Sequence, residues 1–188
     1  MTTAGMPSHG RDEEDKRAVT MTFRINEHTL NALRDESARK EISLNTLVNQ
    51  ILKRFAEWDM YESKVGIVRL TKPVAIYLFA NLDEKQVTDL AKQIGKNAHH
   101  DLALFMKHEI DIDSFLAWYE TRMRVSSVET NHRFSDGVHS YIMKHELGYN
   151  WSLFHKTILE TIFMEMFQKS INVAATNTTL SFRVATNY

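Results

Sequence analysis

The sequence contains no cysteine, and only two prolines and six glycines occur among its 188 residues. Without cysteine the chain forms no disulfides and offers no thiolate ligands, which excludes a disulfide-held secreted scaffold and agrees with a reducing compartment. We therefore expect a cytoplasmic protein. With so little proline and glycine, the sequence also contains no flexible linker that would mark a domain boundary.

Long apolar runs and an excess of one charge are also missing. No stretch approaches the roughly twenty apolar residues of a membrane-spanning helix, and the first residues lack the apolar core of a secretory signal. We therefore expect no membrane partner. The 23 basic and 24 acidic residues give a net charge of −1, so the whole molecule is not a non-specific binder of polyanions.

Between residues 20 and 25, polar and apolar side chains alternate strictly. The polar set is Thr20, Thr22 and Arg24, and the apolar set is Met21, Phe23 and Ile25. Because a strand turns successive side chains to opposite faces, this pattern predicts a strand with one apolar face. Two helical patterns follow it and leave no room for a second strand, so its backbone groups need an outside partner. The simplest partner is the same strand of a second copy of the chain.

Each of the two helical patterns has a start signal. Asn26 is a good N-cap for the first helix, and Ser43 begins the second after a short turn. Apolar residues then recur with the i, i+3, i+4, i+7 spacing of a helix that buries one face. They are Leu44, Leu47, Val48, Ile51, Leu52 and Phe55.

A strand followed by two capped helices resembles the ribbon-helix-helix DNA-binding fold of the Arc, Mnt and methionine repressors. The Thr20-x-Thr22-x-Arg24 ribbon and the Ser43-Leu44-Asn45 helix start carry the resemblance. In that family two ribbons pair antiparallel and lie in the major groove. The resemblance implies an intertwined dimer of residues 19–58, preceded by a flexible arm over residues 1–18.

The resemblance also assigns roles residue by residue. The residues expected at base edges are Thr20, Thr22 and Arg24. The residues expected at phosphates are Ser43, Leu44 and Asn45, together with Lys16 and Arg17 of the arm. Arg24 would favour guanine through its two-pronged donor geometry. Free amides at a helix start hold a backbone phosphate, which fixes the protein on the duplex.

Residues 65–188 are expected to form a second α+β domain, for oligomerisation or sensing. Its elements are expected to be a strand at 65–70, helices starting at Thr71, Asp83 and Asn97, a helix over 110–123 capped by Asp113 or Ser114, a hairpin at Asp136-Gly137, a long helix capped by Asn150, and a hairpin around 176–179. This order is close to a split βαβ arrangement with an antiparallel sheet. It is similar in architecture, though not in motif, to the regulatory domain of nickel-responsive ribbon-helix-helix regulators.

Histidines are frequent in this second part, but their spacing does not predict a metal site. His139 and His145 share a face of one predicted strand and lie about 20 Å apart, so they cannot bind one ion together. His132 is expected to face one of them across the hairpin. Nucleotide-binding loops are also absent, and we predict neither a metal nor a cofactor.

One junction favours a small pocket. His145, Tyr149 and Trp151 lie between a predicted strand and a predicted helix start, where a small-molecule effector could bind. The alternative interpretation is that His145 and Trp151 simply fill a corner of the core.

The sequence contains no catalytic pattern, neither GxSxG nor a Walker loop nor a cysteine nucleophile, so we do not expect an enzyme. We expect a sequence-specific DNA-binding regulator, a repressor, acting as a homodimer or as a tetramer built from two dimers on double-stranded DNA. Three alternatives stay open. They are an antitoxin that binds a toxin through its C-terminal part, a ligand-binding protein whose ribbon serves only dimerisation, and an ordinary edge strand of an α+β domain.

Overall fold

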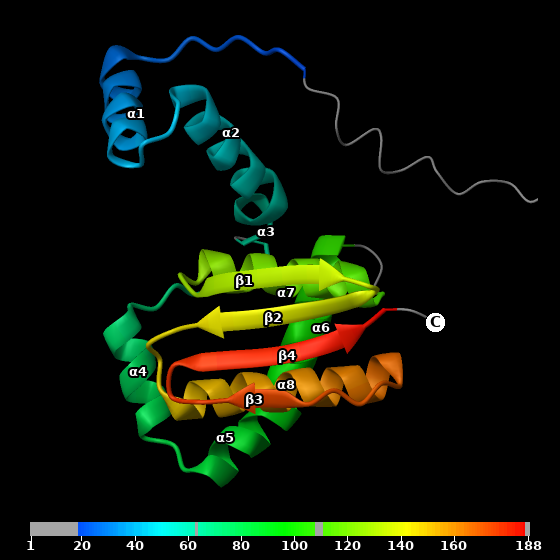
Figure 1. Ribbon diagram of the computed structural model, residues 1–188. Helices are drawn as coiled ribbons and strands as arrows, with labels where there is room; N and C mark the ends of the chain where they lie inside the picture. Colours follow the sequence, from blue (N-terminus) through cyan, green and yellow to red (C-terminus); the bar gives the residue numbers. More distant parts are fainter. Residues whose placement is uncertain (1–18, 63, 108–110, 187–188) are drawn as a thin grey trace, which may run out of the picture. The chain divides into compact units, whose positions relative to one another are not determined.

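The computed structural model describes residues 19–62, 64–107 and 111–186. The fold is α+β, with helices and a four-stranded antiparallel sheet, as the sequence predicted (Figure 1). Its contacts divide the chain into two compact units, of which the first ends at Gln50 and the second begins at Ile51. Every helix in the described ranges is too short or too polar to cross a lipid bilayer.

The first unit contains helices α1 (Glu27–Arg39) and the start of α2 (Leu44–Arg54). Both predicted caps are confirmed. The Asn26 side chain accepts a hydrogen bond from the Thr29 amide at 2.8 Å, and the Ser43 hydroxyl accepts one from the Thr46 amide at 3.0 Å. Between the helices, Glu41 adopts a left-handed conformation with φ of 54°, and the Ile42 amide donates to the Ser37 carbonyl at 3.0 Å. These bonds end α1 and turn the chain sharply into α2.

The helices of the second unit lie mostly before the sheet in the sequence. They are η2 (Phe55–Asp59), α3 (Met60–Glu62), α4 (Lys72–Ala80), α5 (Glu84–Leu90), η3 (Ala91–Gly95), α6 (Lys96–Lys107), α7 (Ile112–Val125) and α8 (Tyr149–Phe167). The predicted starts at Thr71 and Asp83 are confirmed, and Asp83 forms a full capping box with Gln86. The π-helical turn η3, which ends at Gly95, lies between α5 and α6.

The sheet is built from two hairpins. Strands β1 (Glu129–Ser135) and β2 (Val138–Lys144) are joined by Asp136-Gly137, whose φ angles of 54° and 72° suit a tight hairpin turn. Strands β3 (Val173–Ala175) and β4 (Thr179–Ala185) form the second hairpin, and the strand order is β1-β2-β4-β3. Helices α7 and α8 cover one face of the sheet (Figure 1). The core fills the space between them, with Phe115, Tyr119, Tyr141 and Phe163 fully buried.

The strand predicted over residues 65–70 is wrong, and so is the split βαβ arrangement that depended on it. Residues 67–70 are irregular, and Val68 is 78% exposed. Gly66 takes a left-handed φ of 69°, and Arg69 is ion-paired to Glu62. The turn and the ion pair hold the segment beside α3 instead of the sheet.

Two predicted helix caps are also wrong. Asp111, not Asp113 or Ser114, caps α7, and Ser114 completes its capping box. Gly148 stands at the N-cap of α8. Asn150 lies inside the first turn, where its side-chain amide donates to the carbonyls of Phe79 and Leu82 at 2.9 and 2.7 Å. That side chain therefore joins α8 to the end of α4, and it is not free to cap its own helix.

Gly95 is held by a close contact that a single methyl group would disturb. A Cβ at this position would lie 2.7 Å from Cδ1 of Ile158, which is fully buried, and 2.9 Å from the Phe154 ring. We expect Gly95→Ala to lower the free energy of unfolding by about 1–2 kcal/mol, because overpacking outweighs the higher helix propensity of alanine. Urea denaturation measures the change. Asn97→Ala, at an exposed position of α6, is the control and should not destabilise; a Gly95→Ala variant more stable than wild type would contradict the packing.

Candidate nucleic-acid interface

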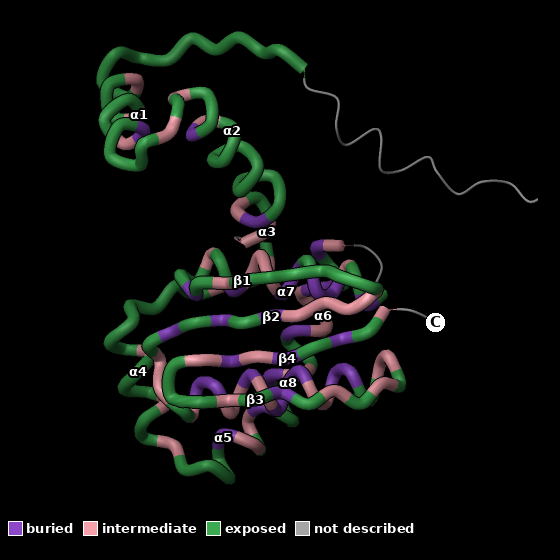
Figure 2. The backbone as a smooth tube through the Cα atoms, in the orientation of Figure 1, coloured by how far each residue is buried: buried purple, intermediate pink, exposed green. Residues whose placement is uncertain are grey.

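Residues 19–25 form an extended segment that pairs with no strand among the described residues. Both of its faces are open to solvent (Figure 2). The exposed fractions of the apolar set are 71% for Met21, 49% for Phe23 and 44% for Ile25. Thr20, Thr22 and Arg24 are exposed as well. The single chain thus leaves unpartnered both the apolar face and the backbone groups that the sequence assigned to a second copy.

The helices of the first unit do not supply a core that could cover this face. Of the described residues up to Gln50, only Ser37 and Leu47 are buried. Leu30, Leu33 and Val48, which belong to the expected apolar stripes, are only half-buried. An apolar patch left open in this way is a candidate interaction site, because few apolar side chains of this unit are buried.

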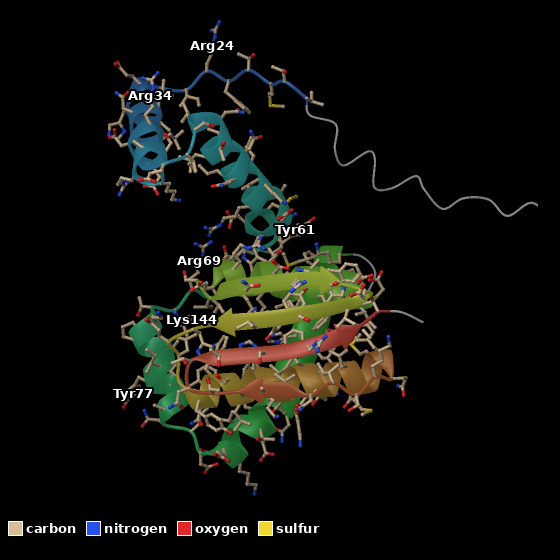
Figure 3. All side chains as sticks on the ribbon, in the orientation of Figure 1. Arg24, Arg34, Tyr61, Arg69, Tyr77 and Lys144 are labelled. Atoms are coloured by element: carbon tan, nitrogen blue, oxygen red, sulfur yellow. The ribbon has the colours of Figure 1, made fainter. Side chains whose placement is uncertain are left out.

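Two arginines of the first unit are available for an anion. Arg24 and Arg34 are exposed, and neither guanidinium forms a hydrogen bond or ion pair with another described residue, although the Arg34 carbonyl accepts from the Ser37 hydroxyl at 2.9 Å. Arg24 points away from both helices (Figure 3). In contrast, Glu36 engages Arg39 and also Lys40, the latter at 3.2 Å. The free cations therefore lie on the ribbon and on the outer side of α1.

The start of α2 was predicted to contact phosphates, and its first backbone amides have no partner within the helix, as at any helix start. Ser43 and Asn45 are exposed, and Leu44 is half-buried. The Thr46 amide donates a hydrogen bond to the Ser43 hydroxyl. The amides before it lie in the first turn, where the helix supplies no carbonyl acceptor. No hydrogen bond in the described part links this helix start to Thr20, Thr22 or Arg24. Lys16 and Arg17, which were also expected to contact phosphates, lie outside the described residues.

The junction predicted to form a pocket lies in the second unit, and two of its three residues are buried there. His145 is buried: its Nδ1 accepts from the Leu147 amide at 3.2 Å, and its Nε2 lies 2.8 Å from the Ser152 hydroxyl. Trp151 packs between the rings of His145 and His155, at 4.4 and 4.1 Å, and Tyr149 is 39% exposed. Burial, followed by the charge of Lys72, lowers the pKa of His145. The rings of His145 and Trp151 therefore pack against each other, and Trp151 also lines a cavity on its other side. A small-molecule site formed by these three residues stays a prediction.

The predicted facing of histidines across the first hairpin is confirmed. Nε2 of His132 lies 2.8 Å from Nδ1 of His139, and the outer nitrogens of the pair face carboxylates of α7. These are Glu120, 3.3 Å from His132, and Asp113, 3.1 Å from His139. Within the described ranges, no three histidine or carboxylate side chains are grouped so that they could hold a metal ion.

A buried polar cluster that sequence reasoning missed lies beneath the sheet. His99 and His155 are buried with their rings 5.6 Å apart, and Tyr119 lies 3.1 Å from Nδ1 of His155. Desolvation, followed by the nearby charge of Arg122, lowers the pKa of His99 well below its usual value. Desolvation lowers the pKa of His155 in the same way, and it raises the pKa of Tyr119. The sequence indicates this cluster only through His99, Tyr119 and His155 themselves, which are polar residues at core positions of three apolar helix faces.

Comparison with known proteins finds no family model, no curated protein and no solved structure that matches this chain. Function is therefore inferred from the residues themselves.

Proposed function

We propose that the protein is a sequence-specific DNA-binding regulator, a repressor, that acts as a homodimer through an intertwined ribbon-helix-helix formed by residues 19–58. The observation that carries the proposal is the open apolar face of Met21, Phe23 and Ile25, which lies on a capped helix pair without a core of its own. A second copy would cover this face and pair the unpaired backbone at the same time.

The proposed mechanism places the paired ribbons in the major groove. Pairing two copies through the apolar face leaves Thr20, Thr22 and Arg24 of each copy on the opposite face, where they read base edges. The first turns of the two α2 helices bind flanking phosphates through their free amides and positive dipole ends. Arg34 adds a charge that contacts the backbone without reading sequence.

The antitoxin alternative has less support than this proposal. Toxin-binding tails are usually short and fold on binding, whereas the second unit has a continuous core that extends from Trp58 to Val184. The ligand-binding alternative differs in one measurable respect, because it requires dimerisation without any affinity for DNA.

Arg24→Ala is expected to weaken specific DNA binding by about 1–3 kcal/mol, or roughly 5- to 150-fold, because the bidentate contact to guanine is lost. The measurement is fluorescence anisotropy of the full-length protein with duplexes selected from a random pool. Arg24→Lys keeps the positive charge and loses the two-pronged guanidinium. We therefore expect it to lower sequence preference more than it lowers non-specific affinity for DNA.

Arg183→Ala is the matched control, because Arg183 is an exposed arginine on β4 that has no role in the proposed interface. It should leave affinity and preference unchanged. If Arg24→Ala binds the selected duplex as wild type does, the ribbon does not read the DNA. If the intact dimer binds no DNA even at low salt, the ligand-binding alternative replaces the proposal.

A further inference from the structure

A cavity of about 300 Å³ lies within the second unit, between residues 67–70, the C-terminal end of α7 and the N-terminal end of α8. Most of its wall is apolar, with Trp58, Ile67, Leu147 and Trp151 among the lining residues. Trp58 and Trp151 are almost fully buried, so two large rings face a space of the size that small organic ligands occupy.

Three charged residues line the same cavity, and two of them neutralise each other. Arg69 is paired with Glu62 through two hydrogen bonds, one of them 2.8 Å long, and it also lies 3.5 Å from Asp59. The third is Arg122, on the last turns of α7. The lining as a whole therefore carries one positive charge that belongs to Arg122.

Arg122 is half-buried, and one nitrogen of its guanidinium lacks a partner. Its Nε is buried without a hydrogen-bond partner, and no carboxylate forms an ion pair with it in the described part of the chain. The guanidinium carbon lies over the Trp118 ring, 5.9 Å from its centre. A buried cation without an acceptor is costly, and a ligand that brings an acceptor into the cavity would remove that cost.

The N-terminal end of α8 adds to the positive potential at the same wall of the cavity. Leu147 and Trp151, which flank the start of this helix, both line the cavity. The N-cap is Gly148, so no side chain accepts a hydrogen bond from the first amides. The dipole of this 19-residue helix therefore reinforces Arg122 in favouring an anion.

We propose that this cavity binds a small organic acid, a monocarboxylate with an apolar body. The carboxylate accepts two parallel hydrogen bonds from the Arg122 guanidinium, because the planar, forked guanidinium matches the two carboxylate oxygens. The apolar body packs against Trp58 and Trp151. A single charge on the ligand balances the single uncompensated charge of the lining, and Glu62 disfavours a second one. This binding does not depend on the proposed DNA interface.

The test uses phenylacetate and hexanoate as probes and their uncharged amides as matched ligands. All three tryptophans of the chain line the cavity or contact Arg122, so intrinsic fluorescence reports binding to the full-length protein without DNA. We expect a saturable fluorescence change with one or both acids, and at least about tenfold weaker binding of the corresponding amide. Equal binding of acid and amide, or no saturable response to either acid at millimolar concentration, would overturn the proposal.

Two variants separate charge from space. Arg122→Gln should weaken acid binding by about tenfold or more and leave the amide unaffected. Ala75→Leu should block both ligands by filling the cavity while Arg122 stays in place. Arg124→Gln, at an exposed neighbour that pairs with Glu120, is the control and should bind as wild type. Circular dichroism checks that each variant is folded. If Arg122→Gln fails to fold, Ala75→Leu and the comparison of acid with amide decide the question. Wild-type affinity for the acid in folded Arg122→Gln, or in Ala75→Leu, would refute the site.

Discussion

Phe23→Asp is expected to abolish the proposed dimer and to unfold the helices of the first unit. Phe23 is the central member of the apolar set, and in a paired ribbon both copies of Met21, Phe23 and Ile25 become buried. Each fully buried side chain of this kind contributes about 1.5–3 kcal/mol, and a carboxylate at the centre of the interface replaces that gain with a desolvation cost. Sedimentation equilibrium gives the mass, and limited proteolysis reports whether α1 and α2 stay protected.

Thr22→Asp is the control for this experiment, because the neighbouring side chain points to the opposite face of the ribbon. It should remain a dimer and lose affinity for DNA, since it adds negative charge where the phosphates and bases approach. A Phe23→Asp protein that stays dimeric, with α1 and α2 still protected, would show that the ribbon is not the interface.

Acidification is expected to destabilise the second unit through His99 and His155. The folded state lowers the pKa of both rings well below the unfolded value of about 6.5, mainly by burial and further through the charge of Arg122. Below about pH 6.5 the two histidines take up protons in the unfolded chain but stay neutral in the folded chain. The stability these neutral histidines contribute is therefore present at pH 7 and is lost as the pH falls toward their folded values.

The size of this effect is up to about 1.4 kcal/mol per pH unit for each histidine that stays neutral. Urea denaturation between pH 7.5 and about 5.5 measures it as a falling midpoint. His99→Leu should reduce the slope by about one proton, because this buried ring is then absent. Stability that is constant or higher at the acidic end would contradict the burial of neutral rings.

The parts of the fold that the sequence predicted are those set by local chemistry. Asn26, Ser43 and Asp83 cap helices because a short polar side chain reaches an amide only two or three residues away. Asp136-Gly137 forms a hairpin because both residues tolerate a positive φ. Each of these signals depends on a few consecutive residues and needs no knowledge of distant contacts.

One failure is local, because the cap of α7 was misplaced by two or three residues. The other two involve contacts outside the segment itself. Residues 65–70 have strand composition, but Arg69 pairs with Glu62, and the sheet already has its four strands without them. Asn150 resembles a cap, yet its amide bonds to carbonyls at the end of α4, about seventy positions earlier in the chain. Local propensity cannot weigh such alternatives, because the competing partner is far away in the sequence.

The two candidate sites differ in how far the sequence could reveal them. The ribbon residues follow from a period of two, whereas the partner that we propose for them is a second chain that one sequence does not describe. Arg122 and Trp151 reach one cavity from different helices, so no spacing within a single helix indicates them. Only the three-dimensional packing shows that no carboxylate among the described residues forms an ion pair with this guanidinium.

The scarcity of buried residues before Gln50 also bears on how abundance would control activity. If two copies must share one core there, the folding of this portion obeys mass action, and dilution alone melts it. The portion that begins at Ile51, with its own continuous core, has no such dependence. In a cell with few copies, the portion after Ile51 would then be folded, whereas the portion before it would be unfolded and unable to bind an operator. Regulation would therefore begin only above a threshold concentration of the protein.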